Sequence, residues 1–320
     1  MSYEPPFTIT SKSINLIAEI SALLERASIT EEESDKIRLR KINRMKTIRG
    51  SLAIEGNTLT EEQVTALIDG KHVFAPVREV QEVRNAILAY DKFMEFNPYN
   101  SKDLLKAHGI MAFGLVDKAG KFRKGNVGVM GNDGIRHIAP PADRVPFLIS
   151  ELFDWLKESS DHILIKSSVF HYEFEFIHPF EDGNGRMGRF WQSRLLAEWN
   201  KIFAYLPIEN MIWENQAEYY KAIEKSTDNT DSGIFVEFML EMILNALKSH
   251  CHDTVNDTVN DTVNIILSVI RENSHASYDE LALKTGKSRI TISRKIAELK
   301  KQGILRRIGA DKNGHWEILR

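Results

Sequence analysis

The stretch His178-Pro-Phe-Glu-Asp-Gly-Asn-Gly-Arg-Met-Gly-Arg189 lies between two runs rich in apolar and aromatic residues, at residues 163–176 and 190–199. Both runs have the spacing of helices, and the first is apolar enough to predict a helix at the centre of a core. The stretch between them is therefore expected to form a loop that leads from one buried helix into the start of the next.

The glycines of this stretch predict an anion site. Gly183-Asn-Gly185 favours a tight turn whose backbone N–H groups converge, and such a turn at a helix N-terminus binds phosphate. Arg186 and Arg189 are three residues apart, on neighbouring positions of the first helical turns. Paired guanidiniums suit a polyphosphate, because each forms bidentate hydrogen bonds.

Three further side chains of the stretch have separate expected roles. Asp182 stands just before the turn and offers a hard carboxylate oxygen to a Mg²⁺ ion that also contacts phosphates. His178 can accept a proton near neutral pH, so it is the candidate base that activates a hydroxyl. Phe180 is expected to anchor the loop in the core.

With these residues the stretch matches the Fic signature H-x-F-x-[D/E]-G-N-G-R-x-x-R at every fixed position. The resemblance to that family extends over roughly residues 50–245. It implies that a Ser, Thr or Tyr hydroxyl of a protein, or of the chain itself, attacks the α-phosphate of ATP and releases pyrophosphate. His178 would take the proton, Asp182 would hold Mg²⁺, and Asn184 with the turn amides would stabilise the developing charge.

The resemblance also assigns the nucleotide contacts. Tyr219-Tyr220 resembles an aromatic pair that lies near the adenine in related proteins, although the family's asparagine beyond that pair is replaced here by the sequence Ser226-Thr-Asp-Asn229. The expected ATP and phosphate contacts are Gly183, Asn184, Gly185, Arg186, Met187, Gly188, Arg189, Tyr219 and Tyr220.

A second motif lies upstream of the core. Ser51-Leu-Ala-Ile-Glu55-Gly56 matches the [S/T]-x-x-x-E-[G/N] inhibitory motif of one class of Fic proteins. By that resemblance the carboxylate of Glu55 pairs with Arg189 and keeps the guanidinium from the γ-phosphate, which leaves ATP in an unproductive pose. In some relatives the same glutamate positions a water that removes AMP, and that role is a further hypothesis for Glu55. The alternative is a solvated glutamate near a helix end.

The glycine-rich segment 119–141 predicts a β-hairpin, with Gly131-Asn-Asp-Gly134 as its turn. It resembles the family's flap, which docks the target segment. By analogy the target would add as a strand beside Val127, Gly128, Val129 and Met130.

The predicted fold is mainly α, a helical Fic core with a small β-hairpin flap and a C-terminal α+β winged helix-turn-helix domain. We expect an N-terminal helical region at residues 1–79 with the inhibitory motif at 51–56, and a catalytic core at 80–249. Residues 250–264 contain three Asp-Thr-Val-Asn repeats, polar and without a core of their own, so a linker is expected there.

Residues 265–320 have the pattern of a winged helix. Ile292, Ile296 and Leu299 are expected to face its core. Residues 262–320 contain 12 Lys and Arg against 6 Asp and Glu, whereas the whole chain has a net charge of −3. This modest basic excess leaves DNA binding and protein contact open. The side chains expected to face DNA are Ser288, Arg289, Thr291 and Arg294.

The sequence favours the cytoplasm. Its start lacks a basic segment followed by an apolar one, no apolar run has the length of a membrane span, and Cys251 is the single cysteine. By analogy with relatives a homodimer is an option. Three functions remain open at this point: an adenylyltransferase, a DNA-binding regulator with a nucleotide-sensing core, and an enzyme of the same fold that transfers another phosphate-linked group.

Overall fold

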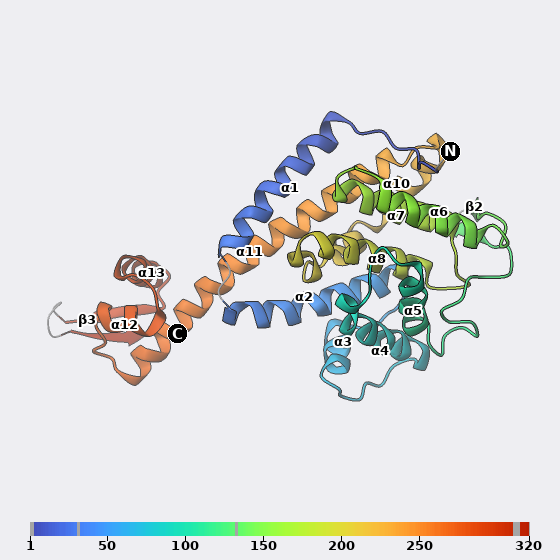
Figure 1. Ribbon diagram of the computed structural model, residues 1–320. Coiled ribbons are helices and arrows are strands. Elements are labelled where there is room, and N and C mark those ends of the chain that lie inside the picture. The colour runs from blue at the N-terminus through green and yellow to red at the C-terminus, as the bar shows by residue number, and fades with distance from the viewer. Residues whose placement is uncertain (1–2, 31–32, 132–133, 310–313, 320) are drawn as a thin grey trace. The chain divides into compact units, whose positions relative to one another are not determined.

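A computed structural model of the chain describes residues 3–30, 33–131, 134–309 and 314–319, and Figure 1 shows its elements. The described chain is mainly helical with two small antiparallel hairpins, which confirms the predicted fold class. In chain order the elements are α1 (Ser11–Thr30), α2 (Glu33–Ile54), α3 (Glu61–Ile68), α4 (Val77–Asp91), η1 (Phe93–Glu95), α5 (Ser101–Met111), β1 (Gly128–Gly131), β2 (Gly134–Ile138), α6 (Val145–Glu158), α7 (Ile163–Ile177), α8 (Asn184–Trp199), η2 (Lys201–Ala204), α9 (Ile208–Glu214), α10 (Gln216–Asn229), α11 (Gly233–Glu272), α12 (Tyr278–Thr285), α13 (Arg289–Lys301), β3 (Leu305–Ile308) and β4 (His315–Ile318).

Two compact units make up the chain, Met1–His250 and Cys251–Arg320. Each has its own apolar core. No helix within the described ranges is long and apolar enough to cross a membrane.

Helices α7 and α8 form the centre of the first unit and pack against each other (Figure 1). Buried side chains occupy every face of both helices, as expected for helices surrounded by other elements. The polar stretch between them is thereby held by the two most enclosed helices of the fold. This explains how a glycine-rich loop acquires a fixed shape.

The end of α2 is brought to the start of α8 by its packing on α9. The two backbones touch at Gly50, where an added Cβ would come within 2.7 Å of the Cα of Asn210. A side chain at this position would separate the helices. Gly50 therefore allows the close approach that sets the position of the following turn of α2.

The predicted hairpin is present as β1 and β2, which pair antiparallel from Gly128 opposite Ile138 to Gly131 opposite Gly134. A bulge interrupts the register between Val129 and Met130. Residues 132 and 133 of the expected turn lie outside the described residues.

Residues 250–264, where a linker was expected, are helical and belong to α11. The segment contains no Gly or Pro, and its repeat places a Val at every fourth position, a spacing that keeps Val on one helical face. Helix formation is limited by nucleation, so a helix already formed by residue 250 extends at little cost.

The second unit has the helix-turn-helix and hairpin expected from its sequence. Ile292, Ile296 and Leu299 of α13 are buried, as predicted, and belong to the same apolar core as Trp316 of β4. The indole of Trp316 donates to the carbonyl of Ala276 at 2.9 Å, so the hairpin is tied to the segment before α12. This confirms the winged-helix prediction.

Candidate active site

The loop between α7 and α8 begins at His178, whose backbone is left-handed, with φ 50° and ψ 61°. This conformation is unfavourable for a residue with a Cβ, and it occurs where the surrounding structure imposes it. The loop ends at Gly183, whose φ of 83° suits glycine. His178 is thus held in a strained turn that precedes the turn predicted to bind an anion.

Asn184 and Phe180 close this loop. The Asn184 side chain accepts a hydrogen bond from the Phe180 N–H at 2.8 Å and donates to the Phe180 carbonyl at 3.0 Å. Phe180 is fully buried, which confirms its predicted role as an anchor. The side chain of Asn184 therefore shapes the loop, and its contact with the nucleotide stays a prediction.

His108 supports the same loop from α5, a role that the sequence analysis missed. Its ring stacks on Phe180 with centroids 3.6 Å apart and planes 2° from parallel. Nδ1 accepts a hydrogen bond from the Gly120 N–H at 2.9 Å, so the proton of the neutral ring is on Nε2, which donates to the Asp182 carbonyl at 3.0 Å. Burial lowers the pKa of His108 to about 4.

His178 lines a pocket of about 240 Å³ together with Gly185 and Arg189. Nδ1 of His178 is buried, and no described residue forms a hydrogen bond with it. The imidazole thus keeps an unused nitrogen in the site. The residues around this pocket are Glu55, Tyr172, Glu175, Phe176, His178, Gly185, Arg189, Tyr219, Tyr220, Ile223, Glu224, Thr227 and Asp228.

The predicted contact between Glu55 and Arg189 is present. Nη2 of Arg189 donates to Oε1 of Glu55 at 2.7 Å and to the Ser51 carbonyl at 2.9 Å, and Nε donates to Oγ of Ser51 at 3.3 Å. The Arg189 side chain is 1% exposed and that of Glu55 is 37% exposed. Burial disfavours the charged guanidinium, but the Glu55 carboxylate, together with Tyr219 and Glu175, outweighs burial, so the pKa of Arg189 is raised.

The same carboxylate lies against the first turn of α8. A Cβ added to Gly185 would collide with Oε1 of Glu55 and approach Nη1 of Arg189 to 2.9 Å. The first turn of a helix has unpaired N–H groups and a positive dipole end, and it attracts anions. Glu55 thus lies where the sequence predicted a phosphate.

Arg186 and Asp182 form a second pair, with Nη2 and Oδ1 3.1 Å apart. Asp182 also pairs with Arg78 of α4 at 2.9 Å and accepts the Gly183 N–H at 2.6 Å. Nε and Nη1 of Arg186 are buried and have no hydrogen-bond partner within the described chain. These donors suit an anion.

One carboxylate beside a phosphate site fits Mg²⁺, which binds one or two protein carboxylates and takes further ligands from phosphates. Asp182 is partly exposed, and its partner Arg78 is an exposed side chain. In the part of the chain that the structure describes, no group of three or more His, Cys, Asp or Glu side chains could hold a metal by itself. Asp182 is therefore suited to a metal that arrives with a nucleotide.

Met187 and Gly188, which were predicted to contact phosphate, lie in the first turns of α8. Met187 is fully buried in the core. Gly188 faces α7, where an added Cβ would lie 2.8 Å from Cδ2 of His171. Because a helix turns by about 100° per residue, Met187 faces away from Gly185 and Arg189. Gly188 instead permits the close packing of α7 and α8.

The rest of the pocket lining is mainly aromatic and acidic. Tyr219 is buried and its hydroxyl lies 3.1 Å from Nε2 of His171, whereas Tyr220 is half-exposed. The sequence analysis missed Tyr172 and Phe176, whose spacing of four places both on the face of α7 that leads to His178. The other missed residues were Glu175, Ile223, Glu224, Thr227 and Asp228.

The predicted docking residues lie at the start of the hairpin. Val127 is half-buried and Gly128 is exposed. The side chains of Val129 and Met130 lie outside the described residues, so their docking role stays a prediction.

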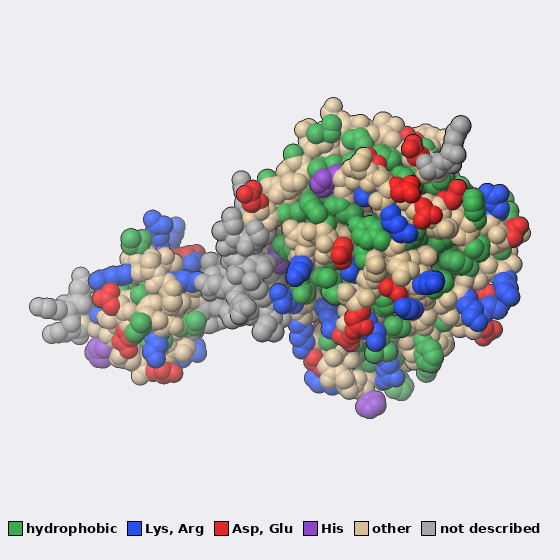
Figure 2. Space-filling view, in the orientation of Figure 1, with side chains coloured by type: hydrophobic (Ala, Val, Ile, Leu, Met, Phe, Trp, Pro, Cys, Tyr) green, Lys and Arg blue, Asp and Glu red, His purple; other side chains and the backbone are tan. Residues whose placement is uncertain are grey.

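The predicted DNA-facing residues are together at the start of α13, and all four are exposed. Ser288 caps the helix by accepting the Thr291 N–H at 3.3 Å, and Arg289 pairs with Asp279 at 3.2 Å. Figure 2 shows Lys and Arg side chains next to acidic ones on the visible face of this unit. DNA binding through this surface stays a prediction.

Comparison with known proteins finds a family match in each of the two units. The Fic/DOC family model matches residues 98–196, and a model described as winged helix-turn-helix DNA-binding matches residues 260–306. A crystal structure of a Fic family protein from Desulfovibrio desulfuricans G20 is 40% identical, with a TM-score of 0.76 over 99% of this chain and 98% of that one. Fic-1 from C. elegans shares the fold at 19% identity, with a TM-score of 0.64 over 77% of this chain and 73% of that one.

Among curated proteins, the protein adenylyltransferase Fic of Drosophila willistoni is 29% identical over 234 residues, which cover 67% of this chain and 43% of the relative. The chain therefore spans less than half the length of this relative.

Proposed function

The chain belongs to the Fic family, and from that premise we propose that it is a protein adenylyltransferase that moves AMP from ATP to a Ser, Thr or Tyr hydroxyl of a protein, or of the chain itself. The observation that supports this proposal is the joint presence of His178, Gly185 and Arg189 around one pocket. A base, an anion-binding helix start and a buried guanidinium are the groups that this transfer requires.

In the proposed reaction the target hydroxyl oxygen attacks the α-phosphorus of ATP. The new O–P bond forms as the bond to pyrophosphate breaks, and the imidazole of His178 takes the hydroxyl proton. The free donors of Arg186 and the amides at the start of α8 hold phosphate oxygens. Mg²⁺ held by Asp182 would neutralise phosphate charge when it is bound.

Glu55 would keep this activity low. Its carboxylate lies at the start of α8 and pairs with Arg189, so it competes with phosphate both for space and for the guanidinium. Arg189 can bind a γ-phosphate only when that pair opens. Removal of AMP by a water positioned at Glu55 is a further part of the proposal.

Incubation with labelled ATP and Mg²⁺ tests the proposal. Glu55→Gly should raise AMP incorporation into the chain well above wild type, and adding His178→Ala should abolish it. Glu61→Ala is the matched control, because Glu61 also pairs with an arginine, Arg49, but at an exposed position. Equal incorporation in all four proteins would contradict the proposal.

The transferred group needs its own measurement. Intact mass of the Glu55→Gly protein after incubation with each nucleoside triphosphate identifies the added group. A mass increase other than that of AMP would replace adenylyl transfer with transfer of a different phosphate-linked group.

A second proposed function is DNA binding by the winged helix. It is supported by the exposed start of α13, where Arg289 and Arg294 accompany two hydroxyl side chains. Arg289→Ala with Arg294→Ala should abolish a salt-dependent shift of duplex DNA. Lys106→Ala with Lys157→Ala removes the same charge from the first unit and should leave the shift intact.

A further inference from the structure

Arg123 is a buried cation whose described hydrogen-bond partners are all backbone carbonyls. The residue is 2% exposed, and burial lowers the pKa of its guanidinium. Nε donates to the His178 carbonyl at 2.8 Å, Nη1 to Gly125 at 2.9 Å, and Nη2 to Pro140 at 2.5 Å and to Ile177 at 3.3 Å.

These carbonyls come from two separate parts of the first unit. Ile177 and His178 are at the C-terminal end of α7, where helical carbonyls lack partners and the helix dipole favours a cation. Gly125 precedes β1 and Pro140 follows β2, so they are the two stems of the hairpin. One planar guanidinium thus connects both stems to the backbone of the proposed base.

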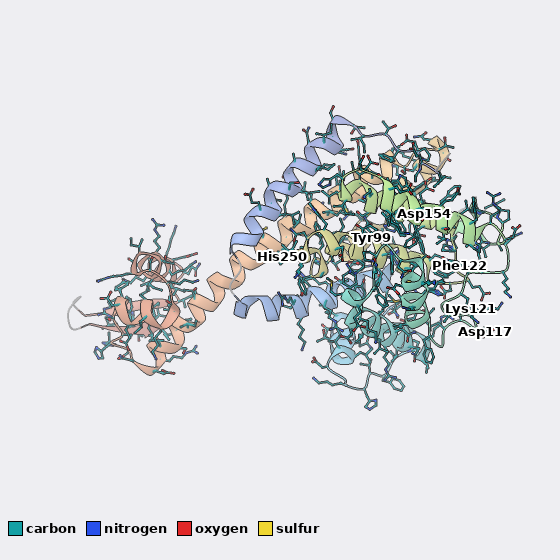
Figure 3. The ribbon with its side chains drawn as sticks, in the orientation of Figure 1. Tyr99, Asp117, Lys121, Phe122, Asp154 and His250 are labelled. Atoms are coloured by element: carbon teal, nitrogen blue, oxygen red, sulfur yellow. The ribbon has the colours of Figure 1, made fainter. Side chains whose placement is uncertain are left out.

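The backbone of Arg123 adds a further connection, because its N–H donates to the Pro179 carbonyl at 2.9 Å. The neighbouring Phe122 stacks on Phe180 inside the loop, with ring centroids 5.9 Å apart. Lys121 and Phe122 lie between α5 and the β1–β2 hairpin in Figure 3. The segment around Arg123 therefore contacts the loop with both main chain and side chain.

A cap for α7 alone would need contacts only to Ile177 and His178. The additional bonds to Gly125 and Pro140 have no role in ending that helix. They fix the distance between the hairpin stems and the left-handed turn that holds His178, whose conformation is unfavourable without outside support.

We propose that Arg123 is a positioning residue that sets the register between the hairpin and His178. The inference rests on the proposed adenylyl transfer, in which a hydroxyl presented near the hairpin must reach the imidazole. Arg123 does not line the nucleotide pocket, so its loss should leave nucleotide binding intact. The rate of AMP transfer should fall, because displacement of a reacting group by about 1 Å reduces the rate about 100-fold.

The test uses the full chain with Glu55→Gly and compares added Arg123→Lys and Arg123→Gln variants. Lysine keeps the charge without the planar fork, and glutamine keeps two donors without charge. We expect the rate of AMP incorporation to fall about 100-fold, while the dissociation constant of α,β-methylene ATP stays unchanged. Unchanged incorporation would overturn the inference, as would a parallel loss of analogue binding and incorporation.

Arg194→Lys is the matched control. Arg194 is also a buried arginine that donates to a backbone carbonyl, that of Phe96 at 2.8 Å, but it has no recorded contact with the hairpin or the loop. It should lose thermal stability with little change in incorporation. Comparing the two variants separates the effect of a displaced His178 from the general effect of altering a buried arginine.

Amide hydrogen exchange distinguishes failure of the inference from failure of the proposed function. If Glu55→Gly alone incorporates no AMP, adenylyl transfer is wrong. Faster exchange in β1, β2 and residues 178–184 of Arg123→Lys, but not of Arg194→Lys, would still support the positioning role. Unchanged exchange would overturn it.

Discussion

Oε1 of Glu55 lies 2.7 Å from Nη2 of Arg189, and the same nitrogen donates to the Ser51 carbonyl one helical turn earlier. The end of α2 therefore provides two hydrogen-bond acceptors for Arg189, one on a side chain and one on the main chain. Loss of the carboxylate leaves the guanidinium partly paired.

This arrangement predicts a ligand-dependent stability difference between Glu55→Gln and wild type. The variant should unfold at a lower temperature without ligand, because a buried cation loses its charged partner. Since Glu55 is partly exposed, the loss should be only about 1–2 kcal/mol. ATP at about 100 times its dissociation constant for the variant should raise the variant's free energy of unfolding by about 2.7 kcal/mol. The same ATP concentration should raise that of wild type by less. Thermal unfolding with and without ATP measures both, and equal shifts would contradict the competition between Glu55 and phosphate.

Gly185→Ala should weaken nucleotide binding even when Glu55→Gly is present. The added methyl enters the space next to Arg189 at the start of α8, where a phosphate would bind. Calorimetry should show at least about a tenfold loss of affinity, equal to 1.4 kcal/mol. Gly109→Ala of α5 is the control, because its Cβ would make an ordinary contact at 3.7 Å. Unchanged affinity of Gly185→Ala would place the phosphates elsewhere.

His108 predicts a pH dependence of stability. Its folded pKa is about 4 against an ordinary value of 6.5, so the unfolded chain binds more protons between those values. The contribution of His108 is complete above pH 6.5 and is lost as the pH falls towards 4. This contribution to the free energy of unfolding amounts to roughly 3 kcal/mol. Urea unfolding across this range should show a shallower decline for His108→Gln. The exposed His72→Gln serves as control, and parallel curves for all three proteins would disprove the neutral tautomer assigned to His108.

The left-handed turn at His178 predicts a conflict between stability and activity. His178→Gly and His178→Ala should both abolish transfer. His178→Gly should be about 1 kcal/mol more stable than His178→Ala, because only glycine adopts a positive φ without steric cost. Chemical denaturation compares the two, and a more stable alanine variant would show that the turn is unstrained.

The sequence predicted much of the site because its chemistry is concentrated in residues that are close along the chain. The pairing of Glu55 with Arg189 was predictable through a second short motif. His108 and Arg123 were not, because their roles depend on tertiary contacts with backbone groups, which leave no local pattern. Met187 and Gly188 were included as phosphate contacts because the motif does not state which face of α8 each position occupies. The helical state of residues 250–264 was not predicted, because the polar composition of the repeats indicated a linker. Extension of the preceding helix into the repeats leaves no such signal in composition.

The unequal burial of the two ions at the pocket has a mechanical consequence. The Arg189 side chain is 1% exposed, while that of its acidic partner Glu55 is 37% exposed, so solvent reaches only the carboxylate of the pair. Rotation of the Glu55 side chain would break its ion pair with Arg189 and leave the hydrogen bonds from Arg189 to Ser51 in place. An approaching cation or a shift of the last turn of α2 would therefore act on the exposed Glu55 carboxylate and not on the buried Arg189 guanidinium.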